Sequence, residues 1–226
     1  MSLREALESG KFLVTAELGP GKGTDVEHSL KDAEIIKDLV DAINVTDLQS
    51  SVMRLGSMAV CHMLTDMGVD PIFQVTCRDR NRLALQSDLL SAWVLGIRNI
   101  LCLSGDHQSF GSQLDSLNVF DIESMNLLRT AKDMHDDGSD MSGFALKEPP
   151  RMFIGAAANP FANPFEWRVH RLAKVAIGKV GVLRRALKHH PEVVVYDIER
   201  YLSPADRAAN EGHDDVVVML KQELVA

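Results

Sequence analysis

The stretch from Phe73 to His107 constrains the fold of this chain more than any other. Two short apolar runs, residues 71–76 and 98–103, flank a polar burst and a long amphipathic segment. This order predicts a strand, a helix and a second strand, which is the repeating unit of parallel α/β folds. Polar residues directly follow both runs. Because binding groups in such folds lie at the carboxyl ends of strands, we expect the functional site there.

The same alternation extends along most of the chain. The expected strands are residues 12–17, 42–46, 71–76, 98–103 and 151–157. The expected helices are residues 24–40, 54–67, 81–95, 121–135 and 164–175. The first helix opens on Thr24-x-x-Glu27, a pattern that predicts a capping box. The rhythm predicts an α/β protein with a parallel sheet, and an eight-stranded barrel and an open doubly wound sheet share it.

The character of the sequence changes after Ala176. Residues 193–196 are one more strand candidate, and residues 203–220 read as two short helices joined at Gly212. The latter segment weakly resembles one ankyrin unit, but a single unit cannot bury its own apolar face, which favours a pair of terminal helices. We therefore expect a (β/α) portion, residues 1–176, and a divergent segment, residues 177–226.

Composition limits the classes of function. A net charge of −8 over 226 residues disfavours nucleic-acid binding. No apolar run is long enough to span a membrane, and the N-terminal residues lack the apolar core of a signal peptide. Three scattered cysteines, Cys61, Cys77 and Cys102, indicate reduced thiols in a cytoplasmic protein.

Two groups of side chains follow the first two expected strands. Glu17 ends the first and can act as a general acid, whereas a solvated acid or one paired with Lys22 is the alternative. The end of the second carries four polar residues, Asn44, Thr46, Asp47 and Gln49. These neutral and acidic hydrogen-bonding groups suit a heterocycle better than a phosphate, and a polar turn with satisfied hydrogen bonds is the alternative.

Two further groups follow the third and fourth expected strands. Arg78 opens a burst of arginines at a helix start, which suits an anion or, alternatively, a solvated helix end. Gly105 allows close approach of a ligand to the backbone. Asp106 can accept a hydrogen bond from a ring N–H or tune a redox cofactor. His107 is a base candidate or a solvent-facing loop residue. The acidic cluster at residues 133–137 lacks metal-ligand spacing, so we expect no metal there.

The strand-end motifs together resemble the methylenetetrahydrofolate reductase family, in its single-domain bacterial and archaeal form. The matching segments are residues 14–20, 44–47, 74–79, 103–107 and 153–160. The resemblance implies a (β/α) barrel that binds FAD and reduces 5,10-methylenetetrahydrofolate to 5-methyltetrahydrofolate, in one-carbon metabolism and methionine biosynthesis. NADH, NADPH or a reduced carrier from a partner is the implied electron donor.

The resemblance also implies roles for individual residues. Glu17 matches the general acid, which protonates a folate nitrogen so that the flavin N5 can deliver a hydride to the exposed iminium carbon. Asp106 matches the acid that tunes the flavin potential and helps bind folate. The other implied cofactor-binding residues are Thr46, Gln74, Thr76, Arg78, Ser104, Gly105, His107, Asn159, Asn163, Arg168 and Lys174. Asn159 and Asn163 replace residues that are often Tyr and His in the family.

The C-terminal part departs from the family, whose members carry further βα units. Five or six strands cannot close an eight-stranded barrel, so terminal helices, a second copy or a partner subunit is expected to cover the open edge. This departure motivates an alternative, a non-catalytic half-barrel that serves as a binding or partner module. A further alternative is an unrelated barrel enzyme that acts on a phosphorylated metabolite through Arg78.

Overall fold

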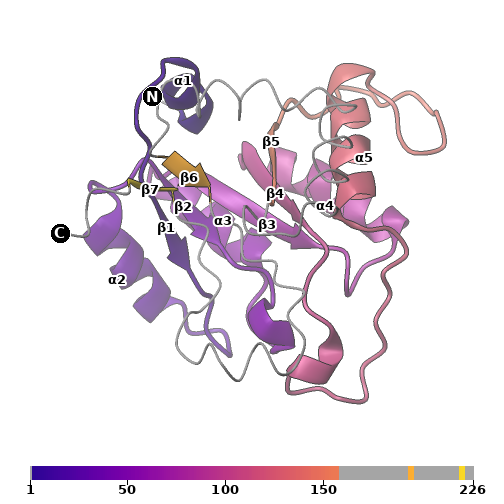
Figure 1. The fold of residues 1–226 in the computed structure, drawn as a ribbon, viewed down its shortest axis with the longest axis horizontal. Helices are drawn as coiled ribbons and strands as arrows, with labels where there is room; N and C mark the ends of the chain where they lie inside the picture. The colour runs from indigo at the N-terminus through magenta and orange to yellow at the C-terminus, as the bar shows by residue number, and fades with distance from the viewer. Residues whose placement is uncertain (1, 158–192, 196–218, 222–226) are drawn as a thin grey trace.

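The computed structural model describes residues 2–157, 193–195 and 219–221. Its centre is a parallel sheet in which five strands follow their order in the chain (Figure 1). The strands are β1 Thr15–Leu18, β2 Ala42–Val45, β3 Pro71–Thr76, β4 Asn99–Leu103 and β5 Phe153–Ala156. The helices are α1 Leu3–Glu8, α2 Glu27–Ile36, α3 Ser57–Asp66, α4 Arg82–Val94 and α5 Ser124–Asp136, and two 3-10 turns are η1 Gln49–Ser51 and η2 Gln108–Phe110.

The sequence alone does not distinguish a barrel from an open doubly wound sheet, but the consecutive order of the strands does. A doubly wound sheet reverses its strand order and carries helices on both faces. Here the order never reverses, and helices α2 to α5 pack into a single core with one face of the sheet. The fold is therefore α/β of the TIM-barrel type, with five strands of an incomplete barrel among the described residues. We call the helix-covered face the outer face and the opposite one the inner face.

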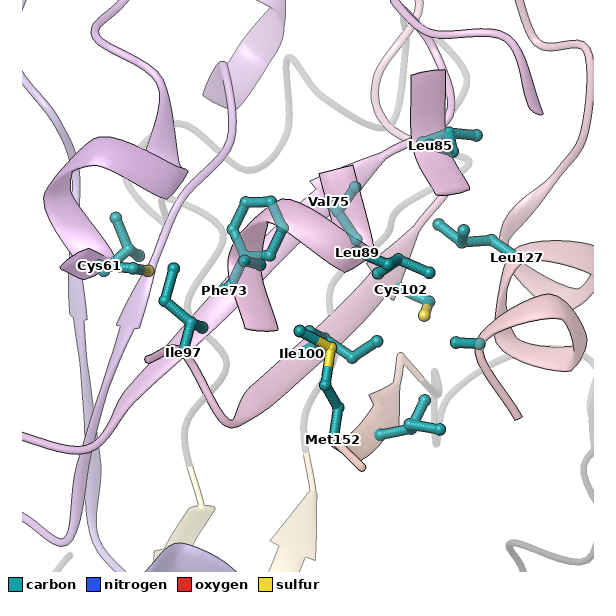
Figure 2. Close-up of a cluster of buried hydrophobic side chains, with 14 of the residues drawn as sticks. Cys61, Phe73, Val75, Leu85, Leu89, Ile97, Ile100, Cys102, Leu127 and Met152 are labelled. Carbon is teal, nitrogen blue, oxygen red and sulfur yellow. The ribbon is translucent and has the colours of Figure 1, made fainter. Parts of the chain in front are cut away.

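The outer face holds the main hydrophobic core, part of which is shown in Figure 2. Successive side chains of a strand point to opposite faces, so alternate residues of β2, β3 and β4 enter this core. Phe73 and Val75 of β3 meet Leu89 of α4 there, and all three are almost completely buried. Every residue of β4 is buried on both faces, as expected for a central parallel strand.

Helix α1 covers the amino-terminal end of the inner face. Its Leu3 and Ala6 belong to a second, smaller cluster with Ala42 of β2, against which Ile72 and Phe153 pack. The helix is short, but its start is well capped, because Ser2 and Glu5 form a capping box. The Leu3 N–H also donates to the Asp70 carboxylate at 2.7 Å. We call this cluster the apolar floor, because it closes the amino-terminal end of the inner face. The polar residues of the inner face lie nearer to the carboxyl ends of the strands.

The predicted capping box at Thr24 is wrong. Helix α2 begins at Glu27, after the N-cap Val26, and it has no side-chain cap. The Asp25 carboxylate accepts the Glu27 N–H at 3.0 Å, a local bond of the kind that competes with helical capping. The helix also ends at Ile36, earlier than expected.

The C-terminal residues that the structure describes form a separate two-stranded sheet. Strand β6, Val193–Val195, confirms the expected strand, but it pairs antiparallel with β7, Met219–Lys221, and does not extend the parallel sheet. Residues 219 and 220 were expected to end a helix, which is wrong. The run of β-branched valines before Met219 suits a strand as well as a helix, and periodicity cannot separate the two over so few residues. The expected helix at 164–175 and most of the expected terminal helices lie outside the described residues, and the division at residue 176 stays a prediction.

The buried thiols give a test of this core. Cys61, Cys77 and Cys102 form no disulfide and have no exposed surface. Burial raises the pKa of the Cys61 thiol, and the nearby Asp47 carboxylate raises it further. We expect the native protein to react very slowly with a thiol reagent such as DTNB, and the protein unfolded in guanidinium to release the signal of all three thiols at once. Rapid reaction of a thiol in the native protein would contradict the packing of α3, β3 and β4.

Candidate active site

Polar side chains collect on the inner face near the carboxyl ends of the first three strands. Ile43 and Val45 enter the outer core, so Asn44 between them faces inward. By the same alternation, Gln74 and Thr76 of β3 face inward on either side of Val75. Residues Glu17 of β1 and Thr46, just after β2, complete this polar group, which we call the inner polar cluster: Glu17, Asn44, Thr46, Gln74 and Thr76.

Two members of the inner polar cluster are buried and have side-chain atoms without a hydrogen-bond partner in the part of the chain that the structure describes. Asn44 is 0% exposed and Thr46 is 2% exposed. Within the described residues, neither the two amide atoms of Asn44 nor the hydroxyl of Thr46 has a partner. A buried polar group left unsatisfied typically costs about 1–3 kcal/mol, so folded proteins keep few of them. Such groups are suited to receive the polar atoms of a ligand.

A buried ion pair ties the end of β2 to the end of β3. The Asp47 carboxylate accepts the Thr76 N–H and the Thr76 hydroxyl, each at 3.0 Å. Arg80 donates to both oxygens of the same carboxylate, with Nη1 to Oδ2 at 2.6 Å. Its Nε also contacts Asp88 of α4 at 2.9 Å. Burial lowers the pKa of the Arg80 guanidinium. The hydrogen bonds that Arg80 donates to Asp47, together with the charges of Asp47, Asp88 and Asp79, outweigh this effect, so the net shift of the pKa is upward.

Arg78 is almost fully buried and binds the chain itself. Its Nε and Nη2 donate to the Asp79 carboxylate at 2.9 and 2.7 Å. Nη1 donates to the Asp106 carbonyl at 3.1 Å, and Nη2 donates to the Leu48 carbonyl at 3.2 Å. The guanidinium thus joins the loops that follow β2, β3 and β4. These contacts give Arg78 a structural role, and its predicted contact with the cofactor stays a prediction.

Gly105 turns the chain sharply after β4. Its φ of +90° lies in the left-handed region that glycine adopts without steric cost. A Cβ at this position would lie 3.1 Å from the Thr76 Cβ and 3.2 Å from the Arg78 Cβ. The close approach brings the loop after β4 against the end of β3, and Asp106 follows directly at the rim of the inner face.

Ser104 and His107 flank this turn and support local structure. The Ser104 hydroxyl donates to the Ser124 hydroxyl at 3.1 Å and accepts the Ser124 N–H, so it holds the start of α5. His107 is exposed and caps η2, where its Nδ1 accepts the Ser109 N–H at 3.2 Å. Of the other predicted residues, Asn159, Asn163, Arg168 and Lys174 lie outside the described residues.

Sequence reasoning missed how these residues are connected. The motifs placed Asp47 and Arg78 at strand ends, but no local pattern indicates that Arg78 binds carbonyls 28 and 30 residues away. Among the described residues, no cluster of His, Cys, Asp and Glu has the arrangement of a metal site. Nor is any helix in that part of the chain both long and apolar enough to cross a bilayer.

The fold and the site define a class, the α/β proteins of barrel type whose polar residues converge at the carboxyl ends of parallel strands. The chain belongs to the methylenetetrahydrofolate reductase family, which its sequence matches over residues 2–140. This match confirms the resemblance seen in the motifs and removes the hypothesis of an unrelated barrel enzyme. A comparison with curated proteins finds no match. The family supports a folate-related reductase function in general and implies a folate substrate, and its members are generally flavin-dependent.

Substitution of Gly105 tests the turn that carries Asp106. Gly105→Ala would force a side chain into the left-handed region and against Thr76 and Arg78. Gly68→Ala is the matched control, because Gly68 has a φ of +77° but no atom within 4 Å of its Cβ position. We expect the control to lose about 1 kcal/mol of unfolding free energy from backbone strain alone, and Gly105→Ala to lose about 1–3 kcal/mol more from overpacking. Urea unfolding of both variants measures the difference, and equal losses would contradict the close packing.

Proposed function

We propose that this chain is an FAD-dependent oxidoreductase that reduces 5,10-methylenetetrahydrofolate to 5-methyltetrahydrofolate. The observation that carries the proposal is the inner polar cluster, a set of neutral hydrogen-bonding groups with one carboxylate, in a family that acts on folates. The non-catalytic half-barrel is not favoured by the family match. The electron donor in this proposal is NAD(P)H or the reduced carrier of a partner.

The residues present fit a flavin in their chemistry. The buried Thr46 hydroxyl, without a partner among the described residues, can donate to a ring carbonyl or accept a ring N–H. Gln74 lies beside it on the inner face with an amide that offers both donors and an acceptor. When bound, FAD supplies the hydride for the reduction. The family resemblance would assign Arg168 and Lys174 to its phosphates and Asn159 and Asn163 to contacts with the flavin, and all four lie outside the described residues.

Glu17 acts as the general acid in the proposed reaction. It lies on β1 beside β2, in the only position of the inner polar cluster that carries a carboxyl group. Proton donation to a folate nitrogen by this carboxyl opens the five-membered ring and leaves an electrophilic carbon. Asp106, at the rim, accepts a hydrogen bond from a ring N–H of the pterin and tunes the flavin by its charge. Arg78 contributes by holding the Asp106 backbone.

We also propose a reducing, cytoplasmic location, which the three cysteines support because none of them is in a disulfide. A second copy or a partner subunit that covers an edge of the sheet belongs to the same proposal. The first experiment is the visible absorption spectrum of the purified protein, before and after anaerobic addition of 5-methyltetrahydrofolate. Bleaching of the flavin bands would support the function. A protein that cannot be loaded with FAD would contradict it.

Glu17→Gln tests the general acid. The amide keeps the size and polarity of the side chain but cannot donate a carboxyl proton, so we expect retained FAD binding and a loss of folate reduction of about 10²-fold or more. Stopped-flow measurement of flavin reoxidation by 5,10-methylenetetrahydrofolate gives the rate. Glu8→Gln, at an exposed site on α1, is the control and is expected to react like the wild type. Equal rates for Glu17→Gln and wild type would remove Glu17 from the mechanism.

Asp106→Asn tests the acid at the rim. Removing a negative charge near the flavin favours its reduced, anionic form, so we expect a higher reduction potential and weaker folate turnover. A redox titration with a reference dye measures the potential. Asp115→Asn, in an exposed part of the same loop, is the control. If neither the potential nor the kinetics of Asp106→Asn differ from those of the control, the proposed role of Asp106 is wrong.

A further inference from the structure

We propose that Asn44 is a further ligand-binding residue, whose carboxamide pairs with the cyclic-amide edge of a planar heterocycle on the inner face. The inference rests on the proposed function and adds a residue to its site. A cyclic-amide edge is a ring N–H next to a ring C=O. Flavins and pterins both carry this edge. The structure therefore indicates the type of ligand group, and the experiment below distinguishes the flavin of FAD from the pterin of the folate.

The direction of the Asn44 side chain follows from its neighbours. Ile43 and Val45 both pack in the outer core, so Asn44 points to the inner face. Ala42, two residues earlier on the same face, belongs to the apolar floor with Leu3 and Ala6. Asn44 is therefore the first polar side chain above the floor on β2, and Thr46 is the next toward the carboxyl end.

The register places Asn44 beside the proposed acid. In the parallel pairing of β1 and β2, Glu17 is the partner of Asn44. Paired residues of neighbouring parallel strands have side chains on the same face, and the strands lie about 4.8 Å apart. On the other side, the β3 residue in register with Asn44 is the apolar Ile72, which offers no hydrogen bond. A ring that reaches Glu17 can therefore also reach the Asn44 amide.

The chemistry of the carboxamide selects the kind of ligand. Asn offers two N–H donors and a carbonyl acceptor in one plane, and it carries no charge. A neutral donor–acceptor pair of this kind complements a ring N–H next to a C=O, and a phosphate would instead require cationic or backbone donors. Both amide atoms are buried and lack partners among the described residues. The amide is thus already shielded from water and faces a partner that the described residues do not supply.

Asn99 provides an internal comparison. It is an equally buried asparagine on β4, 2% exposed. Its amide nitrogen donates to the Asp70 carboxylate at 2.6 Å and to the Pro71 carbonyl at 3.0 Å. Asn99 thus has the hydrogen bonds expected of a structural asparagine, whereas the side chain of Asn44 has none to the described residues. The two residues should respond in opposite ways when the amide is replaced by an apolar group of similar size.

The experiment compares Asn44→Leu with Asn99→Leu in the full chain. The melting midpoint is measured for each protein without ligand. FAD affinity is measured by titrating the stripped protein with FAD and following flavin fluorescence. Pterin affinity is measured by titrating the FAD-loaded protein with 5-methyltetrahydrofolate without oxygen and following flavin bleaching.

We expect Asn44→Leu to melt at or above the wild-type midpoint and to bind at least one of the two ligands tenfold or more weakly. We expect Asn99→Leu to melt lower than the wild type, because the Asp70 Oδ1 and the Pro71 carbonyl both lose the hydrogen bond from the Asn99 amide. Weaker FAD binding by Asn44→Leu would assign the amide to the flavin ring, and unchanged FAD binding with weaker bleaching would assign it to the pterin.

Two results would overturn the inference and leave the proposed function intact. One is a midpoint for Asn44→Leu as low as that of Asn99→Leu, which would make Asn44 a structural residue. The other is a wild-type protein that binds FAD and is bleached by the folate, next to an Asn44→Leu protein with unchanged affinities for both. A wild-type protein that binds neither ligand would instead overturn the proposed function, and the inference with it.

Discussion

The geometry of the site depends on the hydrogen bonds of one buried carboxylate, that of Asp47, at the carboxyl ends of β2 and β3. It has no exposed side-chain surface, and it accepts hydrogen bonds from the backbone and the hydroxyl of Thr76 as well as from Arg80. Loss of one partner from a buried pair costs about 3–5 kcal/mol, because the other charge is left without compensation. The ends of β2 and β3 are therefore held together. Thr46 and Gln74, which lie just before this junction, take their relative positions from it.

Arg78 extends the same arrangement to the fourth strand. Its guanidinium reaches the Leu48 and Asp106 carbonyls, so one side chain links the loops after β2 and β4. Leu48 itself has a φ of +51°, a conformation that costs a non-glycine residue roughly 1–2 kcal/mol. The hydrogen bond from Arg78 compensates part of that strain. Charged side chains consequently hold the loops around the site. The side chains of Asn44 and Thr46, by contrast, take no part in these contacts and can bind a ligand.

The sequence predicted the sheet well where the signals were local. Residues 71–76 form β3 with the expected bounds, because an apolar run rich in β-branched and aromatic residues lies between turn signals. The start of α2 could not be predicted, because the Ser/Thr-x-x-Glu pattern at Thr24 is short and the Asp25 side chain competes for the same N–H. In the site, strand-end positions were predictable from the motifs. The sequence could not predict that the Asn44 amide lacks hydrogen bonds to the described residues, because this depends on the strand register that places Ile72 and Glu17 on its two sides.

The floor formed by α1 also bears on the order of folding. The helix has six residues, too few to be stable on its own in water. Its anchors come from far along the chain, since the Leu3 N–H bonds to Asp70 and the Leu3 cluster packs against Phe153. Such distant contacts form only after the loops between them have closed. We therefore expect helix α1 to dock late in folding, after β5 has joined the sheet and can offer Phe153 to the Leu3 cluster.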